Sequence, residues 1–375
     1  MKALQMVDTK SQYLKIKEEV DSAIQGVLDS AAYIGGKAVQ EFSTSLNEYI
    51  GSKYTITCAN GTDALQIAMM ALGLQPGDEV ITPSFTYIAT TEVVALLRLK
   101  PVFAEVDAKT FCIDPEAIRK AITPKTKAIV PVHLYGHAAP MEAIMAIAKE
   151  YNLFVIEDNA QAIGCDYTFR DGTVKKTGSI GHVGCTSFYP SKNLGAYGDG
   201  GAIFTNDEAL AERLKMTANH GQKVRYLHDL VGCNSRLDAI QAAILNVKLK
   251  RLDSYNAARQ DAAAFYNKAF EGIDWITTPY LAPYSTHVYH QYTLLLNGIN
   301  RDELSTYLTG KGIPNMIYYP VPGHKQKMFA EFGLEDVNLP TTDLLTERVI
   351  SLPIHTELEV EQLNFITTEF LNFKI

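Results

Sequence analysis

The stretch GCTSFYPSKNLGAYGDGGAIFTN, residues 184–206, decides how we interpret the rest of the sequence. It places Lys192 between two β-prone segments, 184–189 and 201–205, and just before the glycine-rich run 195–201. Close-packed glycine backbone can shield a lysine from water, which lowers the pKa of the amine and makes it a usable nucleophile. The stretch therefore predicts a Schiff-base lysine, although a single lysine in a glycine-rich loop is more often an ordinary surface charge.

The composition indicates a soluble globular protein with no nucleic-acid or membrane partner. The chain has 375 residues, 47% of them hydrophobic and 20% charged, and a formal charge of −8 without a basic block. Nucleic-acid binding needs clustered Lys and Arg, and the sequence has no apolar run of about 18 residues to span a bilayer. The N-terminus lacks the apolar core of a signal peptide, so we expect a cytoplasmic protein. The five scattered cysteines indicate neither a disulfide framework nor a metal site.

A turn early in the chain is typical of an anion site. A short β-prone run, 54–58, leads through Gly61 and Thr62 into an apolar helix, 64–72. The free backbone N–H groups and the dipole of a helix both favour an anion at its N-terminus. We therefore predict that Gly61 and Thr62 bind a phosphate, although every strand-to-helix turn offers something similar.

Residues 79–156 alternate between β-prone and helical patterns. Helices are expected over 88–97 and 141–151. Strands, apolar throughout, are expected at 79–82, 102–106, 127–134 and 153–156. Such alternation predicts a mostly parallel sheet covered on both faces, with ligands bound beyond the carboxyl ends of its strands.

At the end of the last of these strands the sequence reads EDNAQ, residues 157–161. A carboxylate that emerges from a buried strand is costly unless it meets a cation or hydrogen-bond donors. Asp158 therefore either caps a helix, a role that Asp serves well, or faces a protonated ring nitrogen with Gln161 beside it. Both alternatives stay open on these residues alone.

The C-terminal third alternates differently, which predicts a second domain. A long helical pattern, 237–270, carries a basic stripe that we interpret as a solvated face: Lys248, Lys250, Arg251 and Arg259. This helix is expected to bridge a large domain over 1–254, with an N-terminal helical arm, and a small α/β domain over 255–375. In the small domain, strands are expected at 291–296, 315–319 and 349–352, and helices at 302–311, 342–348 and from 357 onward.

Together these features meet the needs of pyridoxal phosphate (PLP): an amine for its aldehyde, an acid opposite its ring nitrogen, donors for its phosphate and an aromatic for its ring. Five segments resemble the DegT/DnrJ/EryC1/StrS family of PLP-dependent nucleotide-sugar aminotransferases, in order along nearly the whole chain. They are GTDAL (61–65), PSFTYIAT (83–90), EDNAQAIG (157–164), SFYPSKNLGAYGDGGAIFTND (187–207) and NSRLDAIQAAIL (234–245). The resemblance implies PLP-dependent transferase fold type I (aspartate-aminotransferase-like), with a large α/β domain on a mixed, mostly parallel sheet and a small C-terminal α/β domain.

The resemblance also implies roles for individual residues. Lys192 would bind PLP covalently and act as the catalytic base, Asp158 would keep the ring nitrogen protonated, and Gln161 would contact the ring hydroxyl. The other implied cofactor contacts are Tyr87, stacked on the ring, and a phosphate site of Gly61, Thr62, Ser187 and Asn234. Because the family takes this asparagine from the other subunit, we expect a homodimer with shared active sites.

The expected reaction moves an amino group from L-glutamate to a keto group of a nucleotide-linked sugar. The segments CANGTDALQIA, VITPSFTYIAT and YYPVP are most similar to members that aminate C3. This favours UDP-2-acetamido-2-deoxy-3-oxo-glucuronate, in cell-surface polysaccharide or glycan synthesis, over a dTDP-3-keto-6-deoxyhexose or a 4-keto sugar. The candidate substrate contacts are Tyr318, Tyr319, His324 and Arg225. Two departures count against the uronate: residues 229–233 hold no arginine, and Tyr318 stands where the family often has histidine.

Two functions of other classes fit the sequence poorly. A non-catalytic regulator with this fold would be expected to lose Lys192 or Asp158, and both are present. A phosphate loop at 195–201 would need a GK[ST] ending and a helix after it, and it has neither. The dehydratases of the family carry histidine in place of the lysine, so Lys192 favours a transaminase.

Overall fold

The sheet that carries the candidate site has seven strands in the order β1–β9–β8–β5–β4–β2–β3. The computed structural model describes residues 2–334 and 337–373. The strands are β1 (Tyr54–Cys58), β2 (Glu79–Pro83), β3 (Lys100–Ala104), β4 (Thr126–Ile129), β5 (Phe154–Asp158), β8 (Val183–Ser187) and β9 (Gly201–Thr205). The pairs from β8 to β3 are parallel, and β9 is antiparallel to both β8 and β1. Only β9 is reversed, so the prediction of a mixed, mostly parallel sheet is confirmed.

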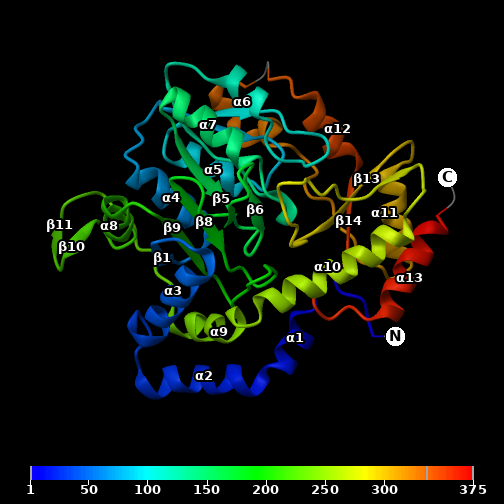
Figure 1. The fold of residues 1–375 in the computed structure, drawn as a ribbon, viewed down its shortest axis with the longest axis horizontal. Coiled ribbons are helices and arrows are strands. Elements are labelled where there is room, and N and C mark those ends of the chain that lie inside the picture. Colours follow the sequence, from blue (N-terminus) through cyan, green and yellow to red (C-terminus); the bar gives the residue numbers. More distant parts are fainter. Residues whose placement is uncertain (1, 335–336, 374–375) are drawn as a thin grey trace.

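Helices cover both faces of this sheet (Figure 1). They are α4 (Gly61–Ala71), α5 (Ala89–Leu96), α6 (Pro115–Ala121), α7 (Met141–Tyr151) and α8 (Glu208–Thr217). Successive strand residues point to opposite faces. In β2, Val80 packs in the cluster that includes α4, α5 and α8, whereas Ile81 packs in the cluster that includes α6 and α7. The apolar strands are therefore buried on both sides, which explains why their sequences do not alternate with polar residues.

A layer formed by the N-terminal helices and α9 packs beside the sheet. It consists of α1 (Thr9–Lys15), α2 (Lys17–Ser30), α3 (Gly36–Ile50) and α9 (Ala239–Leu249). Both α2 and α3 pack against α9, far away in the sequence (Figure 1). Phe42 and Leu46 of α3 meet Leu245 of α9 in a buried cluster that also includes Phe188, from the loop that carries Lys192. This layer therefore packs against the loop that carries Lys192.

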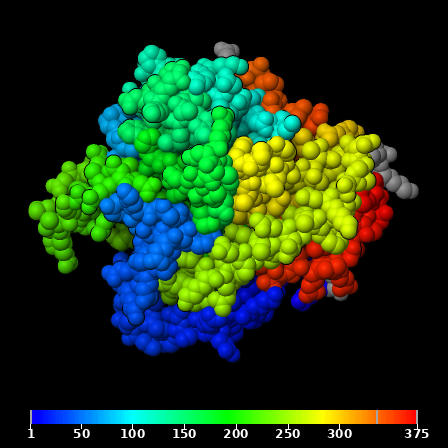
Figure 2. Space-filling model, in the orientation of Figure 1, coloured from blue at the N-terminus to red at the C-terminus, as the bar shows by residue number. Residues whose placement is uncertain are grey.

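The C-terminal part has a core of its own. Helix α10 (Leu252–Ala269) leads to a sheet in the order β12 (Ile276–Thr277), β13 (Tyr292–Leu296), β14 (Val349–Leu352) and to α11 (Arg301–Gly310), α12 (Pro340–Arg348) and α13 (Val360–Leu371). These elements share one apolar cluster, which includes Tyr266, Tyr292 and Phe370. Figure 2 shows the C-terminal segments, in yellow to red, gathered beside the rest of the chain. A domain boundary near residue 255 would fall inside α10, and it stays a prediction.

Two short hairpins project from the main sheet. One joins β6 (Asp166–Thr168) to β7 (Val174–Lys176), and the other joins β10 (Gln222–Val224) to β11 (Leu227–His228). The second lies at the edge of the molecule next to α8 (Figure 1). It exposes the apolar side chains of Val224, Tyr226 and Leu227. Among the described residues, none of the helices has both the length and the apolar character needed to cross a membrane.

The long helix expected over 237–270 is two helices, and the basic stripe on it is solvated only in part, since Lys250 is exposed but two other members are buried. Helix α9 ends at Leu249 and α10 begins at Leu252. Lys248 and Arg259 are 1% and 2% exposed. Arg259 Nη1 donates to three backbone carbonyls, those of Tyr289, His290 and Ile354. The spacing of charges along a helix shows which residues share a face, but it does not show what packs on that face.

Two expected strands also differ from the structure. The strand expected over 127–134 ends at Ile129, although Val130 and Val132 beyond it are buried. Residues 315–319 form no strand and make only an isolated bridge at Met316. An apolar run reports burial, and buried loop residues produce the same pattern as a strand.

Candidate active site

Asp158 is the last residue of β5, at the carboxyl edge of the parallel strands. It is 6% exposed. Thr90 Oγ1 donates to Asp158 Oδ2 at 2.7 Å, and the backbone N of Ala160 donates to Asp158 Oδ1 at 3.2 Å. Within the described residues the carboxylate has no ion-pair partner. A buried carboxylate with so few donors can accept a cation from a ligand.

The neighbouring acid, Glu157, is engaged very differently. Its carboxylate accepts from the backbone N of Gly178, Ile180 and Gly181 and lies 2.9 Å from His133 Nε2. Both side chains of this pair are fully buried. Glu157 is therefore saturated by the protein, because it already receives four hydrogen bonds. Of the two acids in the EDNAQ motif, Asp158 is the one that is free for chemistry.

Lys192 lies in the loop after β8, and its side chain is partly buried. Burial lowers the pKa of the Lys192 amine to about 8, although the negative charge of Asp158 acts in the opposite direction. The amine makes no hydrogen bond or ion pair with another described residue. Tight packing holds the loop in place, since a Cβ on Gly195 would lie 2.3 Å from the carbonyl oxygen of Pro190. The amine is thus withdrawn from water, close enough to Asp158 to sense its charge, and free to react.

The turn before α4 and the end of β8 meet at Gly61 and Ser187, and we call this place the Gly61–Ser187 cradle. Asn60 caps α4 by accepting from the backbone N of Asp63 at 2.8 Å. A Cβ on Gly61 would lie 2.7 Å from Ser187 Cβ, so only glycine lets the helix N-terminus approach Ser187 this closely. Thr62 follows on the first turn of the helix. The helix dipole and the hydroxyls of Thr62 and Ser187 are suited to an anion.

An amide and two tyrosines line another side of the same region. Gln161 accepts from the backbone N of Tyr135 at 2.6 Å and donates through Nε2 to Tyr319 Oη at 2.8 Å. The rings of Tyr87 and Tyr319 have centroids 6.0 Å apart, and the Tyr87 side chain is 56% exposed. Tyr135 donates its hydroxyl to the carbonyl oxygen of Tyr318. An exposed aromatic face thus lies beside an oriented amide.

The structure does not bring every predicted residue to this place. Arg225 lies in the exposed hairpin β10–β11, where its guanidinium stacks 5.0 Å from the centroid of the Tyr226 ring. Asn234 is exposed, and its neighbour Ser235 accepts from the backbone N of Ala59 at 2.9 Å. His324 is buried, with its ring turned to other side chains. The roles of these residues in the site stay predictions.

Sequence reasoning missed Thr90 and Tyr135. Thr90 is the last residue of the motif PSFTYIAT and touches Asp158 directly. The motif contains Thr90, but its spacing does not predict the contact, because Thr90 lies in the first turn of α5 and its partner comes from β5. Tyr135 has a left-handed backbone conformation with φ 58°, and no pattern in the sequence announces its contact with Gln161.

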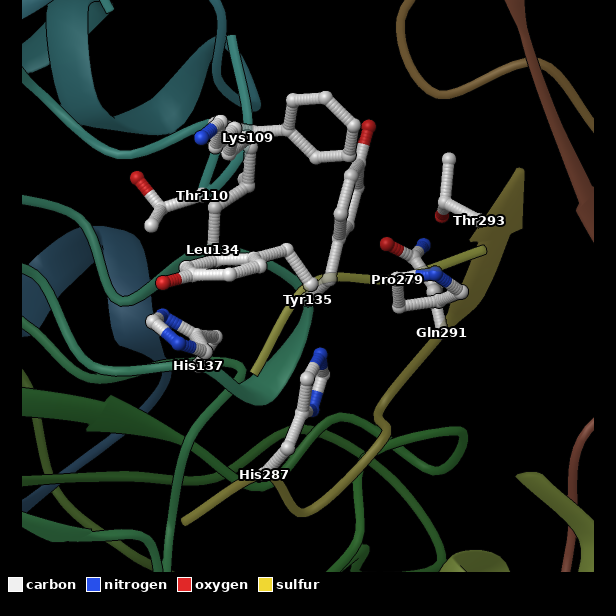
Figure 3. Close-up of a pocket in the computed structure, with 11 residues that line it drawn as sticks. Lys109, Thr110, Leu134, Tyr135, His137, Pro279, His287, Gln291 and Thr293 are labelled. Atoms are coloured by element: carbon white, nitrogen blue, oxygen red, sulfur yellow. The ribbon is translucent and has the colours of Figure 1, made fainter. Parts of the chain in front are cut away.

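Figure 3 shows a small pocket that is lined by Tyr135, His137, His287 and Gln291, among other residues. Its open volume is about 10 Å³. A cavity of this size holds about one water molecule, so it is too small for a cofactor or a sugar. Burial lowers the pKa of His137 to about 4 and holds the pKa of His287 well below its usual value, so both rings are neutral. This pocket is part of the packing behind the site.

The arrangement fits PLP. The unpaired carboxylate of Asp158 suits a protonated ring nitrogen, the free amine of Lys192 suits an aldehyde, and the Gly61–Ser187 cradle suits a phosphate. When bound, PLP supplies a ring that accepts electrons from carbon. The fold and this set of groups define a PLP-dependent transferase of fold type I.

Comparisons with known proteins agree with this class. The chain is 46% identical to the UDP-2-acetamido-2-deoxy-3-oxo-D-glucuronate aminotransferase of Pseudomonas aeruginosa, over 98% of the chain and 100% of that protein. It is 44% identical to the UDP-N-acetyl-3-dehydro-alpha-D-glucosamine 3-aminotransferase of Acidithiobacillus ferrooxidans, over 98% of the chain and 96% of that protein. The crystal structure of Streptomyces venezuelae DesV in complex with a ketimine intermediate superposes with a TM-score of 0.93, at 39% identity and over 98% of each chain. The family model matches residues 14–370, and the chain belongs to the DegT/DnrJ/EryC1/StrS aminotransferase family. It is a PLP-dependent aminotransferase.

Proposed function

We propose that this protein transfers the amino group of L-glutamate to the C3 keto group of a UDP-linked sugar, with UDP-2-acetamido-2-deoxy-3-oxo-glucuronate as the first choice. The single observation that supports this reaction is the state of the Lys192 amine. It is partly buried and unpaired, and the charge of the Asp158 carboxylate, itself without an ion-pair partner among the described residues, acts on its pKa. The choice of sugar rests on the likeness to the two relatives that act on UDP-linked 3-oxo sugars. The product is an amino sugar for a cell-surface polysaccharide or glycan, made in the cytoplasm.

In this proposal Lys192 has two tasks, and the other groups bind or orient the cofactor. Lys192 holds the cofactor before the reaction and then moves the proton at the substrate carbon, because its lowered pKa leaves part of the amine unprotonated near neutral pH. Asp158 keeps the ring nitrogen protonated. Gln161 binds the ring hydroxyl, and Tyr87 covers the ring. Gly61, Thr62, Ser187 and Asn234 bind the phosphate.

The first experiment follows the visible spectrum of the purified holoenzyme. Glutamate should bleach the band of the bound cofactor, and UDP-2-acetamido-2-deoxy-3-oxo-glucuronate should restore it. Recovery only with a UDP-linked 3-oxo sugar that lacks the carboxylate would exclude the uronate. Recovery only with a dTDP-3-keto-6-deoxyhexose, or with a 4-keto sugar, would favour one of those alternatives. If glutamate leaves the band unchanged, the amino donor is wrong.

We further propose a homodimer with shared active sites. Its support is the hairpin β10–β11, which exposes apolar side chains, and the exposure of Asn234 in the same chain segment. Such a patch is costly in water unless a partner covers it. Mixing inactive Lys192→Ala and Asn234→Ala subunits should restore part of the activity, because one of the two sites in a mixed dimer would then be intact. Absence of any rescue would place Asn234 in the site of its own chain.

A further inference from the structure

A buried polar contact joins two loops that lie 240 residues apart in the sequence. Ser84 follows β2, and His324 lies in the short 3-10 helix Gly323–Lys325. Ser84 Oγ and His324 Nδ1 are 2.7 Å apart, and the backbone N of His324 donates to the same Oγ at 3.0 Å. The backbone N of Gly323 donates to the carbonyl oxygen of Ser84 at 2.8 Å. Ser84 and His324 are 0% and 7% exposed. We call this set of three hydrogen bonds the Ser84–His324 clasp.

Protein atoms also surround the remaining sides of the His324 ring. The ring packs 6.4 Å from that of Phe103, measured between centroids. Gly323 must stay small, because a Cβ there would lie 2.9 Å from Phe103 Cε1. On the outer side, His324 Nε2 lies 3.7 Å from Asp343 Oδ1, and Lys325 Nζ lies 2.6 Å from the same oxygen. A ring enclosed in this way is poorly placed to contact a substrate.

Each loop of the clasp carries an aromatic residue of the candidate site. Tyr87 follows Ser84 by three residues, and Tyr319 precedes His324 by five. The rings of Tyr87 and Tyr319 are 6.0 Å apart, and Tyr319 Oη accepts from Gln161. Two prolines stiffen the short connection from Tyr319 to His324. A shift of the clasp would therefore move Tyr319 relative to Gln161.

We propose that His324 is a positioning residue and not a substrate ligand. Through the Ser84–His324 clasp it fixes the positions of Tyr319 and Tyr87 relative to each other at the entrance of the site. The clasp ties the loop before α12 to the end of β2 in the main sheet. It sets the shape of the space that receives the sugar. The proposal rests on the proposed function in one respect, that the acceptor sugar enters beside Tyr319.

The test compares four forms of the holoenzyme: wild type, Ser84→Ala, His324→Asn and the double variant. His324→Asn removes one hydrogen bond of the clasp and Ser84→Ala removes two, so each should speed hydrogen–deuterium exchange at the amides of residues 318–324 by about tenfold or more. The KM for the sugar should rise by about tenfold, with little change in the KM for glutamate. The double variant should be no worse than either single one, because both break the same contact. The control is His182→Asn, which removes an exposed histidine whose Nδ1 accepts a hydrogen bond from the backbone N of Val155, in the main sheet.

Three results would overturn the proposal. If His324→Asn raises the KM for the sugar while Ser84→Ala behaves as wild type, His324 contacts the sugar itself. If exchange is unchanged in both single variants, the clasp does not hold the loop. If exchange rises but the KM for the sugar stays the same, the clasp holds the loop without shaping the site. None of these depends on which sugar is the acceptor, because failure of the proposed function would already appear in the wild-type spectrum.

Discussion

Lys192, in the loop after β8, and Lys248, in the last turn of α9, are two lysines of the same interior whose surroundings differ. Burial lowers the pKa of each amine to about 8. Lys248 is 1% exposed, and its Nζ donates to the carbonyl oxygen of Gly195 at 2.5 Å and lies 5.2 Å from the centroid of the Tyr197 ring. Lys192 has no such partner among the described residues, and it faces the charge of Asp158 instead.

The comparison shows that a lowered pKa does not by itself identify a nucleophile. Both amines are easier to deprotonate than an ordinary lysine, but only one has its lone pair and its donors free. Lys248 uses its position to hold Gly195, three residues after Lys192, and so supports the loop of the reactive lysine. In the proposed function Lys192 carries out the chemistry, and Lys248 binds the backbone of the loop that holds it.

The largest effect should come from removing the side chain of Lys192. Lys192→Ala should abolish the visible band of covalently held PLP and lower turnover by at least about 10³-fold, because both the anchor and the proton-moving group are lost. Absorbance spectra and steady-state rates measure both. The matched control is Lys248→Met, which should keep the band. A Lys192→Ala protein that keeps the band would show that another lysine holds the cofactor.

Removing the charge of Asp158 should have the second-largest effect. Asp158→Asn preserves the shape of the side chain and an oxygen for the Thr90 hydroxyl, but it removes the charge. Turnover should fall by several powers of ten while the unfolding midpoint stays close to wild type. Steady-state rates and thermal unfolding curves of the same preparation test both expectations. Near-normal turnover would contradict the role given to Asp158.

Lys248, which is hydrogen-bonded, should affect the pH dependence of the free energy of unfolding. The pKa of Lys248 is about 8 in the folded protein, below its ordinary value of 10.5. Between these values the unfolded chain binds more protons, so this group makes the wild type more stable as the pH rises through that window. Relative to Lys248→Met, the wild type should gain up to about 3 kcal/mol of unfolding free energy across the window. Urea unfolding at the lowest and the highest pH of this window measures the gain. A difference in unfolding free energy between the two proteins that does not change with pH would mean that Lys248 titrates normally.

A smaller effect is expected in the Gly61–Ser187 cradle. Gly61→Ala would push a Cβ against Ser187 Cβ, which lies 2.7 Å from the ideal position. Overpacking of this kind costs about 1–3 kcal/mol, and we expect a weaker affinity for PLP phosphate with the lysine chemistry intact. Titration of the cofactor-free protein with PLP gives the dissociation constant. Gly77→Ala is a poor control because φ there is 92°, whereas Gly26→Ala meets open space and should change nothing.

Much of the site could be predicted because its parts occur as short local motifs. The strand before Asp158, the glycines around Lys192 and the turn at Gly61 each leave a pattern within about ten residues, and the structure has the corresponding elements at β5, β8, β9 and α4. The mixed sheet followed from apolar runs that alternate with helices. These inferences succeed because backbone geometry and burial are imposed locally.

The failures concern contacts between distant segments. The basic stripe on α9 and α10 looked solvated, but Lys248 and Arg259 meet carbonyl oxygens of other segments. The substrate contact predicted for His324 stays a prediction, but no local pattern shows that its ring forms a hydrogen bond with Ser84, 240 residues earlier in the chain. A sequence shows the chemistry of a polar side chain and not the partner that it finds.

The sequence by itself determined the family and the candidate groups for its chemistry: the lysine, the two adjacent acids and the glycine turn. Only the tertiary structure decided which of these groups are free. Glu157 is saturated by three backbone amides and a histidine, and Lys248 is held by a carbonyl, while Asp158 and Lys192 keep their capacity to bind. The reason is physical: whether a buried charge is available depends on the donors and acceptors around it, and folding brings these from segments that no local pattern connects.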